Sequence, residues 1–117
     1  MTSKQRALEA VKALDAKKAV DIKLMEIKDL TIIADFFLIA TATSNTHARS
    51  LIEEVEKNLE EKGVRPNHIE GKASGWTLLD YGGLIIHIFE RESREYYDLE
   101  RLWSDAAHAD ISDYLTD

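Results

Sequence analysis

Cysteine is absent from this 117-residue chain, proline occurs once and glycine five times. The lack of cysteine excludes disulfide bonds, thiolate nucleophiles and metal sites with cysteine ligands. The low proline and glycine content is unlike that of collagen or of a disordered low-complexity chain. No apolar run approaches the roughly 20 residues of a membrane-spanning helix. Residues 1–6 also lack the apolar stretch of an export signal, so we expect a cytoplasmic protein that does not bind a membrane.

What is present is typical of one globular domain. Apolar residues make up 44% of the chain and charged residues 32%, and a chain of this length can bury one hydrophobic core without crosslinks. No linker, internal repeat or low-complexity block divides the sequence. We therefore expect a single domain over residues 1–106, followed by an acidic, mobile C-terminal tail over residues 107–117.

Negative charge gathers toward the C-terminus of the chain. The net charge is −7, from 22 acidic and 15 basic side chains. Residues 1–28 carry seven bases and four acids, whereas residues 90–117 carry three bases and nine acids. A protein that neutralises many phosphates needs a cationic surface. The sequence thus argues against direct nucleic-acid binding, except marginally through the N-terminal segment. It suits a basic protein partner, although solubility alone would explain the charge equally well.

Hydrophobic spacing predicts two helices in the first half of the chain. Apolar side chains recur at three- and four-residue intervals over residues 3–17, and Ser3 is the expected N-cap. A second helix is expected from the polar segment 43–46 to Lys62, where Gly63 occupies the usual C-cap position. A third helix is expected to begin near residue 92 or 93. Its predicted apolar stripe consists of Tyr96, Leu99, Leu102 and Trp103.

Strand patterns lie between these helices. Residues 19–28 alternate and then change parity, which indicates a strand that is bulged or covered on both faces. Residues 36–42 are continuously apolar, as in a central strand buried on both sides. Residues 64–69 form a weaker candidate, because Pro66 would restrict it to an edge or a strand start. The next segment, residues 70–75, is expected to be a loop.

A β-hairpin is predicted over residues 76–81 and 84–89, joined by Gly82 and Gly83. Since opposed residues share a face, the two-residue turn sorts the side chains into two sets. The set expected to face the core is Thr77, Leu79, Tyr81, Leu84, Ile86 and Ile88. The other set is Trp76, Leu78, Asp80, Ile85, His87 and Phe89.

The element order predicts a mixed β-sheet of about five strands with helices packed on it, in the α/β (α+β) class. The second hairpin face combines large apolar groups with an acid and an imidazole, a composition typical of protein-binding surfaces. The alternative is that a helix covers this face and that Asp80 and His87 satisfy each other or a backbone group.

No catalytic or metal-binding motif is evident. The four histidines have no metal-ligand spacing, and Ser44 does not lie in a nucleophile elbow. Glu54 with Glu56, and Glu90 with Glu92, are paired acids of the kind that hold magnesium, but solvated charges explain them better. We expect no catalytic residue, cofactor or metal.

Several ordered segments resemble the ribosomal silencing factor family, also called Iojap-like. The resemblance spans about residues 5–106, and one departure is Gly83, where an acid is common in the family. The matching segments are Asp35-Phe36-Phe37-Leu38-Ile39-Ala40-Thr41 with Ser44 and His47, Glu70-Gly71, Gly75-Trp76-x-Leu78-Leu79-Asp80-Tyr81-Gly82, His87-Ile88-Phe89, and Tyr97-x-Leu99-Glu100-x-Leu102-Trp103-x-Asp105-Ala106.

The resemblance implies a translation repressor without catalytic activity. Such proteins bind the large ribosomal subunit through the ribosomal protein numbered fourteen, and the bound factor sterically blocks joining of the small subunit under nutrient limitation. A role in large-subunit maturation is also implied, as is a nucleotidyltransferase-like fold without the catalytic carboxylates. Ribosomal proteins are typically basic, so an acidic binder is steered toward them.

Within this reading, Trp76 is the expected anchor in an apolar pocket of the partner. The other expected contacts are Leu78, Asp80, Glu70, Glu90, His87 and Tyr81, although the hairpin register puts Tyr81 on the opposite face. Tyr97 and Glu100 are expected at the rim, and Trp103 in the core. Two alternatives stay open: a nucleotidyltransferase-like phosphoryl-transfer enzyme that uses Glu90, Glu92 or Asp80, and a homodimeric adaptor that buries Trp76 between two copies.

Overall fold

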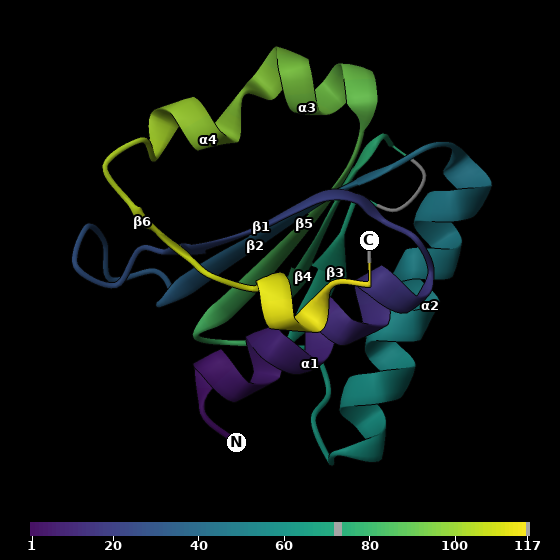
Figure 1. Ribbon diagram of the computed structural model, residues 1–117, viewed down its shortest axis with the longest axis horizontal. Coiled ribbons are helices and arrows are strands. Elements are labelled where there is room, and N and C mark those ends of the chain that lie inside the picture. The colour runs from purple at the N-terminus through teal and green to yellow at the C-terminus, as the bar shows by residue number, and fades with distance from the viewer. Residues whose placement is uncertain (72–73, 117) are drawn as a thin grey trace.

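The computed structural model describes residues 1–71 and 74–116, and in this part of the chain six strands form one mixed sheet (Figure 1). The strand order is β3-β4-β5-β2-β1-β6. Strands β2 (Phe36–Ala42) and β5 (Leu84–Glu90) are parallel, and the other neighbouring pairs are antiparallel. The other strands are β1 (Val20–Glu26), β3 (His68–Glu70), β4 (Trp76–Asp80) and β6 (Ala107–Ala109). The predicted α/β class is confirmed, with one strand more than expected.

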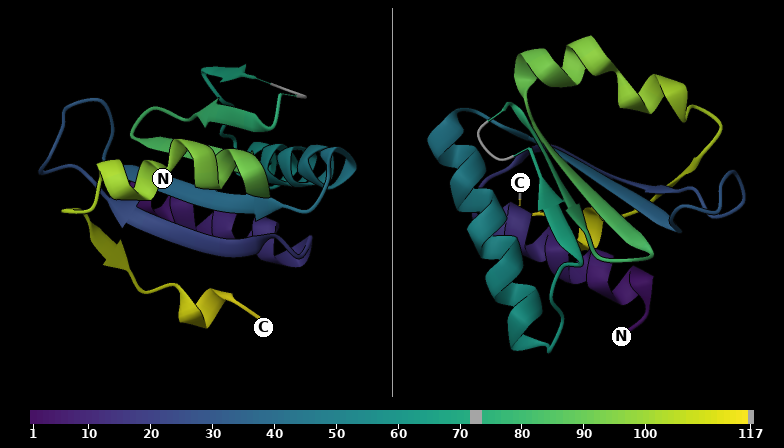
Figure 2. Two further views of the ribbon diagram at one scale, coloured as in Figure 1. Left: turned by 90° about the horizontal axis from the view of Figure 1, so that it is seen from above. Right: turned by 180° about the vertical axis from the view of Figure 1, so that it is seen from behind.

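Helices cover the two faces of this sheet unequally. The long helices α1 (Ser3–Ala16) and α2 (Asn45–Glu61) lie on one side, which we call the first face. The short helices α3 (Arg91–Tyr97) and α4 (Leu99–Leu102) lie across the opposite side, the second face (Figure 2). A 3₁₀ helix, η1 (Ser112–Tyr114), returns to α1 on the first face.

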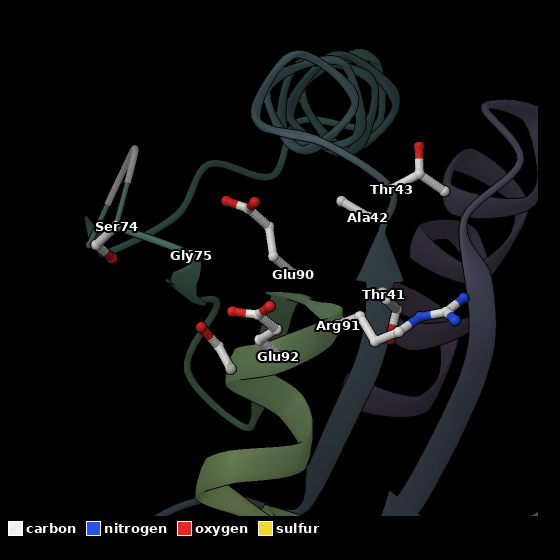
Figure 3. Close-up of a pocket in the computed structure, with 9 residues that line it drawn as sticks. Thr41, Ala42, Thr43, Ser74, Gly75, Glu90, Arg91 and Glu92 are labelled. Carbon is white, nitrogen blue, oxygen red and sulfur yellow. The ribbon is translucent and has the colours of Figure 1, made fainter.

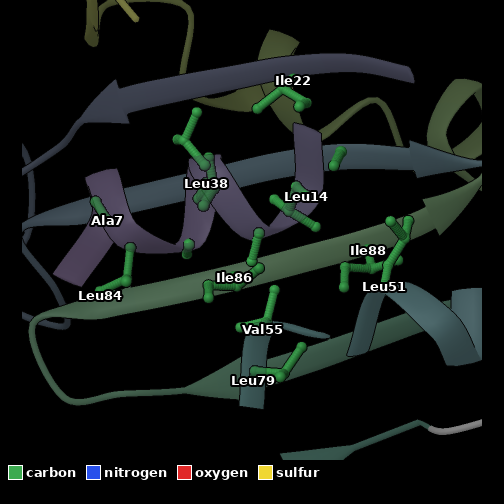
Figure 4. Packing of buried hydrophobic residues seen from close by; sticks show 14 of the residues in the cluster. Ala7, Leu14, Ile22, Leu38, Leu51, Val55, Leu79, Leu84, Ile86 and Ile88 are labelled. Carbon is green, nitrogen blue, oxygen red and sulfur yellow. The ribbon is translucent and has the colours of Figure 1, made fainter. Parts of the chain in front are cut away.

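The larger hydrophobic core lies between the first face and helices α1 and α2 (Figure 4). Apolar side chains at helical spacing enter it from the helices, and alternate residues enter it from the strands. Burying each such leucine or isoleucine contributes roughly 2 kcal/mol. Fully buried members include Leu14, Leu38, Leu51, Leu59, Leu79, Leu84 and Ile86.

Both long helices begin at capping residues. Helix α1 is capped by Thr2 and not by the predicted Ser3: the Thr2 hydroxyl accepts from the Gln5 N–H at 3.1 Å, and the Gln5 side chain accepts from the Thr2 N–H at 2.8 Å. This reciprocal capping box satisfies two backbone donors. Helix α2 is capped by Ser44, and Gly63 follows it with a φ of +80°, as the sequence predicts for a glycine that ends a helix.

Strands β2 and β1 match their sequence patterns. Every residue of β2 is buried, as expected for a strand covered on both sides. The register of β1 against β2 shifts between Val20 and Lys23, so the strand contains a bulge, but the parity change after Leu24 arises because both faces of the strand are covered. Beyond the bulge, Leu24 faces the first core and Met25 faces a second cluster on the other side of the sheet.

The hairpin register is confirmed. Trp76 pairs with Phe89, Leu78 with His87 and Asp80 with Ile85, and the Tyr81 N–H donates to the Leu84 carbonyl at 2.8 Å across the Gly82–Gly83 turn. The weak strand expected over residues 64–69 is shorter and later, because only β3 pairs with β4. The loop expected over residues 70–75 includes Lys72 and Ala73, which lie outside the described residues.

The third helix is not continuous. Asp98 adopts a left-handed conformation, with φ of 47° and ψ of 51°, and separates α3 from α4. The predicted apolar stripe is therefore wrong in part: Tyr96 and Leu102 are exposed, whereas Leu99 and Trp103 pack against the second-face cluster. A single helical spacing cannot hold across a residue that changes the direction of the chain.

The C-terminal segment is packed against the domain and is not the expected mobile tail. Strand β6 pairs with the end of β1, Ile111 is buried in the first-face core, and the Thr116 N–H donates to the Asp15 carboxylate. These contacts bring residues 107–116 into the sheet and its core. The last residue, Asp117, lies outside the described part of the chain.

Candidate functional site

The second face of the β4–β5 hairpin carries the candidate site. Alternation along β4 directs Trp76, Leu78 and Asp80 to this face, while Thr77 and Leu79 enter the first-face side. Trp76 and Leu78 are half-buried, since α3 and α4 cover the middle of the face but not β3 and β4 at one side of it (Figure 2). The sequence prediction that an aromatic and an aliphatic group share this face with an acid is confirmed.

Trp76 stands within an aromatic cluster. Its ring stacks on Phe89 with centroids 5.0 Å apart and lies 4.6 Å from the ring of Tyr97. Its indole N–H donates to Nδ1 of His87 at 3.2 Å. Trp76 is thus neither a fully buried core residue nor a free surface side chain. It is held by three neighbours and leaves part of its ring open.

His87 lies beneath Trp76 and not at the surface. Only 3% of it is exposed, and its ring forms a T-shaped pair with the Phe37 ring, with centroids 4.7 Å apart. Burial lowers the pKa of His87 to about 4, so the imidazole is neutral at physiological pH. The sequence predicts that His87 contacts a partner directly, but its side chain is buried and does not reach the surface.

Acidic side chains border the hairpin at the outer edge of the sheet. Pairing of β3 with β4 puts Glu70 opposite Leu78 and His68 opposite Asp80. His68 lies within 4 Å of both acids, with N–O separations of 3.8 Å to Glu70 and 3.6 Å to Asp80. The Asp80 carboxylate also accepts from the Gly82 N–H at 2.8 Å. Glu70 and Asp80 therefore lie on the same surface as Trp76 and Leu78.

Two predicted contact residues lie on the other side of the sheet. Tyr81 is 1% exposed, and its hydroxyl has no hydrogen-bond partner among the described residues. Burial, with a smaller effect from the Glu56 and Glu60 carboxylates, raises the pKa of Tyr81. Glu90 follows the parity of Ile88 and faces α2. The structure thus does not bring Tyr81 or Glu90 to the Trp76 surface.

Arg94 fixes α3 and α4 over the second face. Its guanidinium is buried and donates to the Asp21 carbonyl at 2.7 Å, to the Thr41 hydroxyl at 2.8 Å and to the Glu100 carboxylate at 2.9 Å. These bonds join the β1 bulge, the end of β2 and α4 to α3. Because α3 also carries Tyr97, Arg94 determines where the tyrosine meets Trp76.

The most exposed part of this surface is a residue that the sequence did not predict as a contact. Tyr96 is 82% exposed and packs edge-on against Tyr97, with centroids 5.0 Å apart. Tyr97 contacts Trp76 at the end of α3, just before Asp98. The available signal was the short polar interruption at Asp98, a residue type that tolerates the left-handed conformation. A second exposed apolar group, Leu30, Ile32 and Ile33, lies in the connection between β1 and β2.

A separate cavity of about 700 Å³ opens at the carboxyl ends of the parallel strands β2 and β5 (Figure 3). Ligands of α/β proteins commonly bind at such an edge. Glu90 and Glu92 both line the cavity, with Ser74 and Thr43 nearby. Within residues 1–71 and 74–116, no group of three or more histidine or acidic side chains could hold a metal ion.

Asp80 is remote from these two glutamates. It pairs with Ile85 near the start of β5, whereas Glu90 ends that strand. Five residues of extended strand correspond to roughly 17 Å. The three acids named for the enzyme alternative are therefore not brought together.

Among the described helices, none has both the length and the apolar character needed to span a bilayer.

Comparison with known proteins gives one consistent result. Residues 1–117 match the family described as "Ribosomal silencing factor during starvation". A ribosomal silencing factor from Halalkalibacterium halodurans is 34% identical over 116 residues, which cover 97% of this chain and 99% of that protein. A crystal structure from Chromobacterium violaceum superposes with a TM-score of 0.85 at 31% identity, covering 89% of this chain and 88% of the other.

A relative that matches over a shorter stretch carries a name that refers to one ribosomal subunit. It is the mouse protein named "Mitochondrial assembly of ribosomal large subunit protein 1", which is 35% identical over 74 residues, or 60% of this chain and 32% of that protein. Together with the match over the whole chain, these similarities establish that the chain belongs to the ribosomal silencing factor family.

Proposed function

We propose that this chain binds the large ribosomal subunit through the surface around Trp76 and thereby blocks joining of the small subunit. The partner we propose is the basic large-subunit protein numbered fourteen, and the site of action is the cytoplasm. The chain would act by occupying the surface of the large subunit that meets the small one. It would neither form nor break a covalent bond.

The observation that carries this proposal is the half-buried aromatic cluster bordered by carboxylates. Trp76 and Tyr97 present apolar surface, and Glu70 and Asp80 supply negative charge on the adjoining strands. Tryptophan and tyrosine are the residue types that dominate the energetics of protein interfaces. Acidic groups around them suit a basic ribosomal protein, and the net charge of −7 attracts it over a longer range.

Sedimentation of purified bacterial ribosomal subunits tests the proposal. We expect the chain to migrate with the large subunit and not with the small one, and to lower the fraction of joined particles when both are mixed. Association should slow as salt rises, because the Debye length falls from about 10 Å at 0.1 M to about 3 Å at 1 M. Failure to migrate with the large subunit at moderate salt would contradict the proposal.

The enzyme alternative is tested with the same preparation. The cavity that holds Glu90 and Glu92 is its structural basis, and nucleotide binding in the presence of magnesium is its requirement. Under our proposal, calorimetry with ATP and magnesium gives no binding heat. Turnover of a nucleotide by the isolated chain would support the enzyme instead.

The homodimer alternative has a basis in the same exposed aromatic groups. If two copies bury Trp76 between them, light scattering should report a dimer whose mass falls to that of a monomer in Trp76→Ala. Such a result, combined with unchanged binding of Trp76→Ala to large subunits, would favour the adaptor over the silencing factor described above.

A further inference from the structure

We propose that His87 is a positioning residue: its imidazole holds the Trp76 indole with the N–H turned into the protein, so that a partner contacts only the carbon surface of the ring. The inference rests on the proposed function, because Trp76 is taken as the anchor for the bound partner. It adds the chemistry of the partner's pocket, which must be apolar and needs no hydrogen-bond acceptor for the indole.

The geometry of the two side chains is the basis for this role. Nε1 of Trp76 donates to Nδ1 of His87 over 3.2 Å, from a diagonal position on the neighbouring strand. The imidazole is itself fixed, because Phe37 meets it edge-on and Phe89 lies nearly parallel to it, with centroids 6.2 Å apart. A buried, immobile acceptor therefore determines the orientation of a half-buried anchor.

The protonation of His87 follows from the same bond. Because Nδ1 accepts the indole N–H, the neutral imidazole must carry its own hydrogen on Nε2. Nε2 is buried and has no hydrogen-bond partner among the described residues. A buried N–H without a partner destabilises a fold. Stability alone does not account for a histidine here, whereas the need for an acceptor beneath Trp76 does.

The consequence for binding is preorganisation. Trp76 is confined by Phe89 and Tyr97 as well as by His87, so it loses little rotational freedom when a partner closes on it. The indole N–H is also already satisfied, and a partner that offered an acceptor would gain nothing from it. Shape and apolar contact are then the features that the partner's pocket must match.

A set of variants tests the role through the dissociation constant for purified bacterial large ribosomal subunits. Phenylalanine at position 87 fills the space without an acceptor, whereas asparagine places an oxygen near the position of Nδ1. We expect His87→Phe to weaken binding about three- to tenfold, as for ordering one aromatic side chain on binding, with Tm unchanged or raised. His87→Asn should recover most of the affinity. His108→Phe, at an exposed histidine of β6, is the matched control and should bind normally.

A double-mutant cycle separates positioning from packing. Trp76→Phe lacks the indole N–H, so adding His87→Phe in that background should weaken binding no further. Additive losses in the double variant would overturn the proposal. So would an equal loss in His87→Asn and His87→Phe, because His87 would then contribute volume alone.

The free chain provides a readout that does not depend on the ribosome. In ¹H–¹⁵N spectra, the Trp76 indole N–H should exchange slowly with solvent in the native chain and in His87→Asn, and faster in His87→Phe. The Trp103 indole serves as the internal reference. If the native chain ignores large subunits while this pattern holds, the proposed function fails and the role of His87 stands. Identical exchange in all three forms would contradict the role of His87 itself.

Discussion

The two faces of the sheet are made by the same strands but are covered to different extents. On the first face, α1 and α2 seal the core, and side chains such as Leu79 and Ile86 are fully buried. On the second face, α3 and α4 cover the centre and leave Trp76 and Leu78 half-buried on β4. The second face thus has a buried cluster at its centre, and alternation along β4 places Leu79 in the sealed core of the first face but Trp76 and Leu78 at a partly open surface.

Adjacent leucines of β4 give the strongest test of this division. Leu79→Ala should lower the free energy of unfolding by about 3–4 kcal/mol, because it opens a cavity in a sealed core. Leu78→Ala, one residue away on the second face, should cost less than about 1 kcal/mol of stability and instead weaken binding to large ribosomal subunits. Urea unfolding and a binding assay on both variants check the comparison. Equal losses of stability would show that the second face is also a sealed core.

The buried imidazole of His87, on the second face, should make the free energy of unfolding depend on pH. Its folded pKa of about 4 lies below the ordinary value of 6.5, so the unfolded chain binds more protons between these values. The free energy of unfolding should therefore rise by about 3 kcal/mol from pH 4 to pH 6.5 on account of this one group.

His87→Phe removes the titrating group and is the control for that prediction. Its free energy of unfolding should fall less steeply with decreasing pH than that of the native chain, as measured by urea unfolding at a series of pH values. If both chains lose stability equally over this interval, His87 is not held neutral by burial, and the protonation assigned to it is incorrect.

The smallest effect on stability and binding is expected from a substitution of Tyr81, on the first face. Its hydroxyl is buried and unpartnered within the described residues, so Tyr81→Phe should leave stability unchanged or raise it by about 1 kcal/mol. Binding to large subunits should not change, since the side chain is not exposed. A loss of affinity in a variant that remains folded would show that Tyr81 contributes to the interface with the partner.

Local patterns in the sequence were sufficient for the parts of the fold that depend on near neighbours. The continuous apolar run of β2 and the two-glycine turn of the hairpin predicted a central strand and a register, and both are confirmed. A two-residue turn leaves little freedom in pairing, and strand period then assigns each side chain to a face. The shared position of Trp76, Leu78 and Asp80 followed from this reasoning.

Features that depend on distant contacts could not be predicted in this way. The segment after residue 106 is acidic and short, yet β6 gains partners on β1 and Ile111 enters a core formed by residues far away in the sequence. The left-handed Asp98 redirects the chain and exposes Tyr96, which helical spacing had assigned to a buried stripe. The burial of His87 likewise depends on how α3 and α4 pack over the sheet.

The most direct test of the account is the affinity of Trp76→Ala for purified large ribosomal subunits. Trp76 joins the aromatic cluster of the second face to the open surface. The account predicts a folded variant whose binding is weaker by about 2 kcal/mol, or about thirtyfold, and which no longer prevents subunit joining at concentrations where the native chain does. A folded Trp76→Ala chain that binds and blocks joining as tightly as the native one would contradict it.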